Sequence, residues 1–285
     1  MPRARILSLA EAIEEHLRDG DTLAMEGFTH LIPFAAGHEV IRQRRRDLTV
    51  VRMTPDLIYD QLIGAGAARR VVFSWGGNPG VGSLHRFRDA VGNGWPNPIE
   101  IEEHSHAAMA CAYDAGASGL PFAVLRGYCG SDLPAVNPAI RSVVCPYTGE
   151  ELATVPALRP DVTVIHAQKA DRDGNVLIEG IVGVQKQAAL AATRAVVVTV
   201  EEIVDELQCG PNACVLPGWV VSAVAAVPGG AHPSYAHGYY PRDNAAYRAW
   251  DAISRDREAF TAWLAETVMA GRPEDFAVHV RRRAA

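Results

Sequence analysis

Two carboxylates and two imidazoles lie within the five residues Glu102–His106. This density of titratable groups suits general acid–base chemistry, with Glu103 and His106 as candidates. The segment follows a short expected strand at 98–102 and opens an expected helix, where acidic side chains also complement the helix dipole. Capping accounts for one glutamate but not for both histidines. A functional and a structural interpretation of this segment are therefore equally supported.

Arg126 follows the apolar segment 121–125, which is expected to be a strand. Its guanidinium can fork onto the carboxylate or phosphate of a ligand. A buried structural ion pair explains an arginine at this position equally well. Both interpretations of Arg126 stay open at the level of sequence.

Glycines form a second class of candidate, because their backbone admits a ligand without a Cβ in the way. Gly76 and Gly77 follow the expected strand 70–75, in a turn that also holds Gly80 and Gly82. Backbone N–H groups of such a turn can cradle phosphate, although the spacing matches neither a P-loop nor the dinucleotide fingerprint. The glycine spacing is weak support for a phosphate site.

Gly27 and Phe28 lie between an expected strand at 22–26 and a helical pattern from 33 to 46. A strand, a glycine turn and a helix start are the parts with which open α/β sheets bind ligands. An ordinary connecting loop has the same parts. The local pattern alone favours the ordinary loop.

The elements that must position these residues alternate along the chain. Short apolar segments rich in β-branched residues predict strands at 22–26, 47–53, 70–75, 161–166, 195–200 and 219–227. Helical patterns are found at 10–18, 33–46, 55–63, 84–91, 105–117, 184–192 and 243–270. The turn pair Asp173-Gly174 predicts a hairpin over 166–175. This alternation predicts an α/β fold with an open, mostly parallel sheet and helices on both faces. We expect one domain over 1–285, with a small lobe near 100–155.

Composition limits the function classes. The net charge of −6 gives no support for nucleic-acid or anionic-membrane binding, and no apolar run approaches the 18 residues of a membrane span. Five cysteines without a CxxC pair indicate reduced thiols in a cytoplasmic protein and argue against a zinc site; they are Cys111, Cys129, Cys145, Cys209 and Cys214. We expect no metal and no permanently bound cofactor.

Several segments together resemble the A (α) subunits of family I coenzyme A transferases. The segment Gly20–Phe28 is similar to the N-terminal signature of that family, with Glu26 in place of its first glycine. Further similar segments extend the resemblance over about residues 6–268; they are Arg52–Asp56, Phe73–Gly80, Glu102–His106, Ile165–Asp171 and Pro228–Pro233.

The resemblance implies transfer of coenzyme A from succinyl-CoA to 3-oxoadipate, with the coenzyme A thioester as substrate. In this family a glutamate attacks the thioester and forms a covalent intermediate, which divides a hard acyl transfer into easier steps. That glutamate belongs to the B (β) subunit, in a Ser-Glu-Asn-Gly type motif that this chain lacks. The chain is therefore expected to need a B subunit, in an α2β2 assembly.

The resemblance also assigns roles to the candidate residues. Gly27 and Phe28 would line the subunit junction, while Glu103 and His106 would lie at the acyl pocket. Gly76 and Gly77 would admit close backbone approach. Arg126 would pair with a carboxylate of the dicarboxylic acid.

Three alternatives stay open. The chain can be a glutaconate-type transferase subunit, or a subunit of a ring-cleaving acyl-CoA hydrolase that uses an acidic residue near Glu102 and Glu103. It can also be an α/β binding or regulatory subunit with no active site of its own. Sequence does not decide which of the two glutamates faces the cleft.

Overall fold

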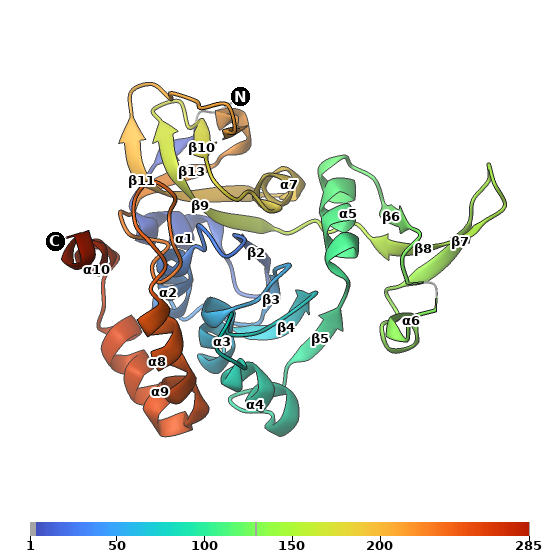
Figure 1. Cartoon of the computed structure of the whole chain (residues 1–285), viewed down its shortest axis with the longest axis horizontal. Coiled ribbons are helices and arrows are strands. Elements are labelled where there is room, and N and C mark those ends of the chain that lie inside the picture. Colours follow the sequence, from blue (N-terminus) through green and yellow to red (C-terminus); the bar gives the residue numbers. More distant parts are fainter. Residues whose placement is uncertain (1–3, 129, 285) are drawn as a thin grey trace.

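The computed structural model describes residues 4–128 and 130–284, and it is built around one large twisted sheet (Figure 1). Its main path is β1-β13-β11-β9-β2-β3-β4-β5, with every neighbouring pair on that path parallel. In that order the strands are Arg5–Ile6, Ala223–Ala226, Ala195–Val204, Val162–Asp171, Thr22–Glu26, Leu48–Val51, Ala68–Phe73 and Glu100–Glu103. Strands β10 (Val176–Ile178) and β12 (Cys214–Leu216) extend it by antiparallel pairing. The mostly parallel sheet confirms the predicted fold class.

Helices cover both faces of this sheet, as predicted. The alternation of side chains along β2 shows this directly, because Leu23 and Met25 pack into one core cluster and Ala24 into another. The first face carries α1 (Leu9–His16), α2 (Phe34–Arg42), α3 (Leu57–Gly64), α4 (His85–Asn93), α8 (Asn244–Arg255) and α9 (Arg257–Trp263). The second face carries α5 (His106–Ala117) and α7 (Gln185–Ala191). The remaining helices are α6 (Leu133–Val136) and α10 (Asp275–Ala284), with a 3-10 turn at Gly218–Val220 and a π-helix at Leu264–Met269.

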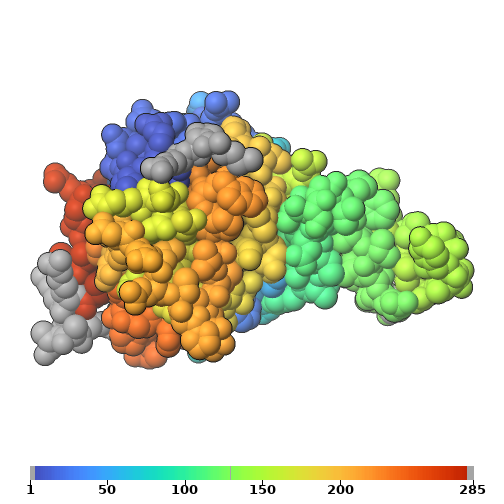
Figure 2. All heavy atoms as spheres, turned by 90° about the horizontal axis from the view of Figure 1, so that it is seen from above, coloured from blue at the N-terminus to red at the C-terminus, as the bar shows by residue number. Residues whose placement is uncertain are grey.

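A separate antiparallel sheet projects from the main body (Figure 2). It consists of β6 (Phe122–Leu125), β8 (Glu151–Pro156) and β7 (Arg141–Val144), in that order. We refer to residues 121–157 as the lobe. It lies close to the range expected for a small lobe, while the assignment of the whole chain to one domain stays a prediction.

Four local predictions fail, each for a physical reason. The helix expected at 243–270 is broken at Asp256, whose extended backbone ends α8 while its side chain caps α9. The helix expected at 33–46 ends at Arg42, because Arg44 has a left-handed φ of 55°. The strand expected at 219–227 begins only at Ala223, after the 3-10 turn. Finally, Ser105 and not a glutamate caps α5, because Glu102 and Glu103 belong to strand β5.

The hairpin prediction is confirmed. Strands β9 and β10 pair antiparallel, and Gly174 takes the positive φ of 82° that the turn between them requires. The four described cysteines are free thiols, and Cys129 lies outside the described residues. Within the described part of the chain, no helix has the length and apolar character needed to cross a membrane.

Candidate active site

The loops that follow β2, β3, β4 and β5 lie next to one another, because these parallel strands are neighbours in the sheet. We call the residues 27–31, 52–56, 74–78 and 104–106 the rim. Backbone hydrogen bonds connect its loops: Ser74 N–H donates to the Met53 carbonyl at 3.1 Å, and His104 N–H donates to the Phe73 carbonyl at 2.8 Å. Carboxyl ends of parallel strands are where open α/β sheets bind ligands. The rim is therefore the candidate active site.

Gly27 opens the tightest turn of the rim. A Cβ on Gly27 would lie 2.6 Å from the Leu31 carbonyl oxygen and 2.9 Å from that of His30, so only glycine fits. Thr29 and Leu31 have left-handed φ values of 56° and 53°, which L-residues rarely adopt. Backbone strain of this kind is concentrated at functional sites.

The buried ring of His30 holds this turn in place. Its Nε2 accepts from His237 N–H at 3.0 Å, and its Nδ1 lies 3.2 Å from the Ile181 carbonyl oxygen. Burial lowers the pKa of His30 to about 4, so the ring is neutral at pH 7. A neutral ring satisfies both contacts when Nδ1 carries the proton. His30 is thus a structural residue of the rim and not a general acid.

Arg52 fixes the orientation of the Gly27–Phe28 peptide. Its fully buried guanidinium donates to the Gly27 carbonyl oxygen at 2.7 Å and to Asp56 Oδ1 at 3.0 Å. A trans peptide directs its N–H opposite to its carbonyl. Because the Gly27 carbonyl is held toward Arg52, the Phe28 N–H is directed away from the buried network.

Glu26, one residue before Gly27, is committed to the interior. Its Oε1 accepts from Met53 N–H and from the Tyr113 hydroxyl, both at 2.9 Å. Burial raises the pKa of Glu26 to about 7, although the nearby Arg52 acts in the opposite direction. This carboxyl group links β2, β3 and α5, and it is too buried to attack a substrate in the rim.

The structure decides which glutamate of the 102–106 segment is accessible. Glu102 is mostly buried and accepts from Arg70 and from His104 Nε2, the latter at 2.8 Å. The hydrogen bond from His104 is the main cause that lowers the pKa of Glu102. Glu103 is exposed, and its carboxylate has no hydrogen bond or ion pair among the described residues. His106 is exposed as the first residue of α5.

Aromatic and aliphatic side chains are exposed around the rim. Phe28 is 36% exposed and Trp75 is 45% exposed, and both lie in rim loops. Ile181 and Val182 are exposed as well, and Gly183, which follows them, lies close to the Phe28 side chain. Gly77 packs against the Trp75 ring, whereas Gly76 is open to solvent. Neighbouring exposed apolar side chains of this kind are typical of surfaces that bind a protein or ligand.

Arg126 lies apart from the rim, in the lobe. Its side chain is 75% exposed and forms an ion pair with Glu150 at 3.2 Å, so the pair is not the buried one considered from sequence. The same loop does reach the rim, because Ser105 N–H donates to the Tyr128 hydroxyl at 2.9 Å.

Of the residues singled out from sequence, the structure brings Gly27, Phe28, Gly76 and Gly77 into the rim. Glu103 and His106 lie at its outer end. Sequence reasoning gave no role to His30 and no function to Arg52. A charged residue directly after the apolar strand 48–51 was the available signal for Arg52.

Comparison with known proteins gives a consistent result. The family model for coenzyme A transferase matches residues 6–226. The α chain of the 3-oxoadipate CoA-transferase of Pseudomonas knackmussii is 69% identical, over 93% of this chain and 94% of that protein.

More distant relatives share the same fold. The crystal structure of glutaconate coenzyme A-transferase from Acidaminococcus fermentans superposes with a TM-score of 0.89 at 31% identity, covering 97% of this chain and 92% of that one. The cholesterol ring-cleaving hydrolase IpdA subunit of Mycobacterium tuberculosis is 30% identical over 98% of both chains.

Proposed function

This chain belongs to the coenzyme A transferase family, and we propose that it is the A (α) subunit of an enzyme that transfers coenzyme A from succinyl-CoA to 3-oxoadipate. The observation that carries the proposal is the 69% identity to the α chain of a 3-oxoadipate CoA-transferase over nearly the full length of both chains. We further propose a cytoplasmic α2β2 assembly with a B subunit.

In the proposed reaction, a glutamate carboxylate that the B subunit supplies attacks the thioester carbonyl of succinyl-CoA and releases the coenzyme A thiolate. The thiolate then attacks the glutamyl carbonyl of the resulting anhydride, which releases succinate and leaves a glutamyl-CoA thioester. The carboxylate of 3-oxoadipate attacks that thioester, and the released thiolate completes the exchange on the new anhydride. Each step forms one acyl bond and breaks another.

The role of this chain is to complete the cleft. The Phe28 N–H, directed away from Arg52, is suited to donate to the oxyanion that forms at the acyl carbonyl. Gly76, open to solvent, leaves room for close approach of the substrate to the backbone. The exposed side chains of Phe28 and Trp75 provide apolar surface for the junction with the partner.

Arg126 is proposed to bind the distal carboxylate of the acid. Its pair with Glu150 is exposed, and exposed ion pairs contribute only about 0–1 kcal/mol, so exchanging one carboxylate for another costs little. Glu103 and His106 lie at the outer end of the rim, where they are available to the acyl group.

A second candidate function rests on Glu103. An exposed carboxylate without a protein partner can activate water, and one relative is a ring-cleaving hydrolase subunit. In that reaction coenzyme A thioester serves as a bound substrate while a carbon–carbon bond of its ring is hydrolysed. The two functions differ in whether an acyl group passes to a second acid.

The test is thioester exchange with the purified chain, by itself and together with its B subunit. We expect succinyl-CoA and 3-oxoadipate to yield 3-oxoadipyl-CoA only in the pair, with a glutamyl adduct trapped on the partner. Glu103→Gln is expected to leave this adduct in place. Loss of the adduct in Glu103→Gln would move the nucleophile to this chain, and absence of exchange in the pair would overturn the transferase proposal.

A further inference from the structure

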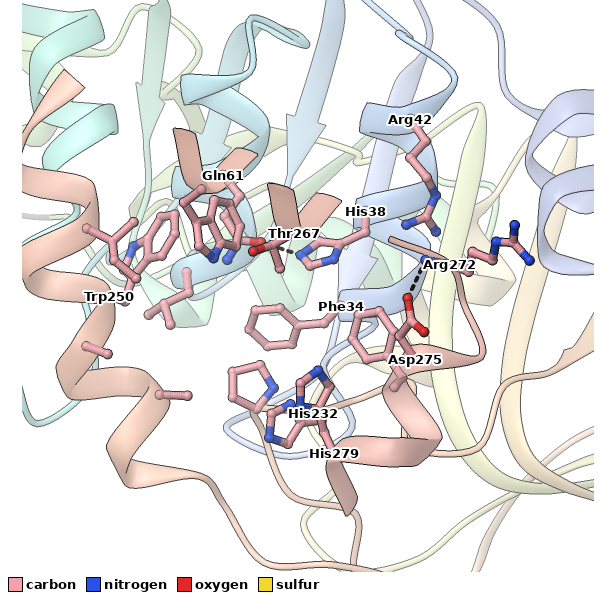
Figure 3. Close-up of a pocket in the computed structure, with 17 residues that line it drawn as sticks. Phe34, His38, Arg42, Gln61, His232, Trp250, Thr267, Arg272, Asp275 and His279 are labelled. Carbon is pink, nitrogen blue, oxygen red and sulfur yellow. Dashed lines mark hydrogen bonds between the residues drawn. The ribbon is translucent and has the colours of Figure 1, made fainter. Parts of the chain in front are cut away.

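A cavity of about 230 Å³ lies on the helical face of the sheet, away from the rim loops (Figure 3). Its walls come from α2, α3, α8, the π-helix with the residue before it, and α10, together with the loop at His232 and Pro233. None of the rim residues lines it. The cavity is therefore a second candidate site, independent of the acyl transfer proposed above.

Aromatic rings form most of the cavity surface. Trp250 and Trp263 meet edge to face with centroids 4.7 Å apart, and Phe276 lies 5.3 Å from the ring of His38. Phe34 completes this set from the start of α2. Rings in these orientations favour a flat apolar ligand that can stack or meet their edges. An engineered protein cavity of about 150 Å³ binds benzene, so this one has room for a single substituted ring.

One polar pair, His38 and Gln61, faces the apolar space (Figure 3). His38 Nε2 lies 2.9 Å from Gln61 Oε1, which can only accept, so Nε2 carries the proton. Burial lowers the pKa of His38 to about 4, and the ring is neutral at pH 7. Nδ1 therefore has a free lone pair, and it makes no hydrogen bond to a described residue. A ligand that donates a hydrogen bond would satisfy it.

The charges around the cavity disfavour an anionic ligand. Arg42 is paired with Glu39 at 2.8 Å, and it also donates to the Val268 carbonyl. The guanidinium of Arg272 points away from the cavity, whereas the Asp275 carboxylate lies at its edge (Figure 3). A carboxylate inside would meet a neutral imidazole and a nearby negative charge. An uncharged ligand avoids both costs.

The wall contributed by Leu264–Met269 is a π-helix, with Thr267 on the cavity. Such turns are rare and occur frequently at functional sites. This is a second observation, independent of shape and polarity, that the segment serves binding.

We propose that this cavity binds an uncharged single-ring molecule with one hydroxyl group, its ring held among Phe34, Trp250 and Phe276 and its hydroxyl donating to His38 Nδ1. Phenol is the simplest probe of that chemistry. Toluene has the ring but not the donor, and benzoate has the ring with a negative charge.

The test is isothermal titration of the full chain, purified together with its B subunit, with these three probes at pH 7.5. We expect saturable binding of phenol, about tenfold weaker binding of toluene because His38 Nδ1 loses its donor, and benzoate weaker still. Equal affinities for phenol and toluene, tightest binding of benzoate, or no saturable binding of phenol would each overturn the proposal.

Two variants separate the site from nonspecific binding. Ala249→Phe, at an exposed position of α8 that lines the cavity, should abolish phenol binding by filling it. Ala245→Phe, exposed on the same helix but outside the cavity, is the matched control and should bind phenol normally. His38→Phe should keep toluene binding and remove the preference for phenol. Normal phenol binding in Ala249→Phe would refute the location.

Discussion

The Gly27→Ala variant tests whether the tight turn of the rim serves catalysis. The new Cβ would lie 2.6 Å from the Leu31 carbonyl oxygen, inside the 3.0 Å that real Cβ atoms keep from other atoms. The obstructing atoms belong to the backbone of the same turn, and its left-handed residues Thr29 and Leu31 leave it little freedom to adjust. The turn must therefore open by several tenths of an ångström.

The magnitudes follow from this displacement. Overpacking of a well-packed site costs about 1–3 kcal/mol, and loss of glycine entropy in the unfolded chain returns at most about 1 kcal/mol. We expect the free energy of unfolding to fall by about 1–2 kcal/mol. Misplacement by about 1 Å can cost 10²-fold in rate. Because Gly27 carries the peptide that presents the Phe28 N–H, kcat/KM should fall about ten- to hundredfold.

The measurements are urea unfolding and thioester exchange in the complex with the B subunit. Gly92→Ala is the matched control, because no atom lies within 4 Å of the added Cβ and the residue belongs to the surface of α4. Replacing that helical glycine should raise stability by about 0.5–1 kcal/mol without affecting exchange. Wild-type exchange rates in Gly27→Ala would refute the argument that this turn positions a catalytic group.

Three further predictions concern charged groups. Burial raises the pKa of Glu26 from 4.5 to about 7, so the folded protein binds its proton more tightly and loses about 3 kcal/mol of stability as pH rises from 4.5 to 7; Glu26→Gln should remove this loss in urea unfolding at pH 5 and pH 8, and an unchanged pH dependence would contradict the assignment. Arg52→Met should cost about 3–5 kcal/mol by leaving Asp56 buried without its partner, whereas a loss below 1 kcal/mol in the same assay would show that Asp56 is not charged there. Arg126→Gln should raise KM for 3-oxoadipate about tenfold with kcat and stability little changed, because its pair with Glu150 is exposed; an unaltered KM in steady-state exchange would exclude Arg126 from acid binding.

The fold could be anticipated because its signals are local. Strand β2 and the hairpin between β9 and β10 follow from apolar β-branched segments and from one Asp-Gly turn. The failures lie where one residue overrides a periodic pattern. At Asp256 the amphipathic pattern continues across the break, but the carboxylate caps the next helix. Periodicity does not report such a choice, because capping depends on one backbone conformation.

The site was only partly accessible in the same way. Sequence placed Gly27 and Gly76 after strands, and the sheet order then brought their loops together. It gave no means to separate Glu102 from Glu103. Adjacent strand residues point to opposite faces, so the register of β5 with β4 decides that Glu102 meets Arg70 while Glu103 stays exposed.

The sequence by itself determined the alternation of strands and helices and the similarity to coenzyme A transferases, because both reside in neighbouring residues. Only the tertiary structure decided which polar groups are buried and what they contact. The hydrogen bond from Arg52 to the Gly27 carbonyl joins residues 25 positions apart, and the cavity at His38 is closed by residues more than 200 positions away. Such contacts depend on burial and on the packing of distant elements, which no local pattern encodes.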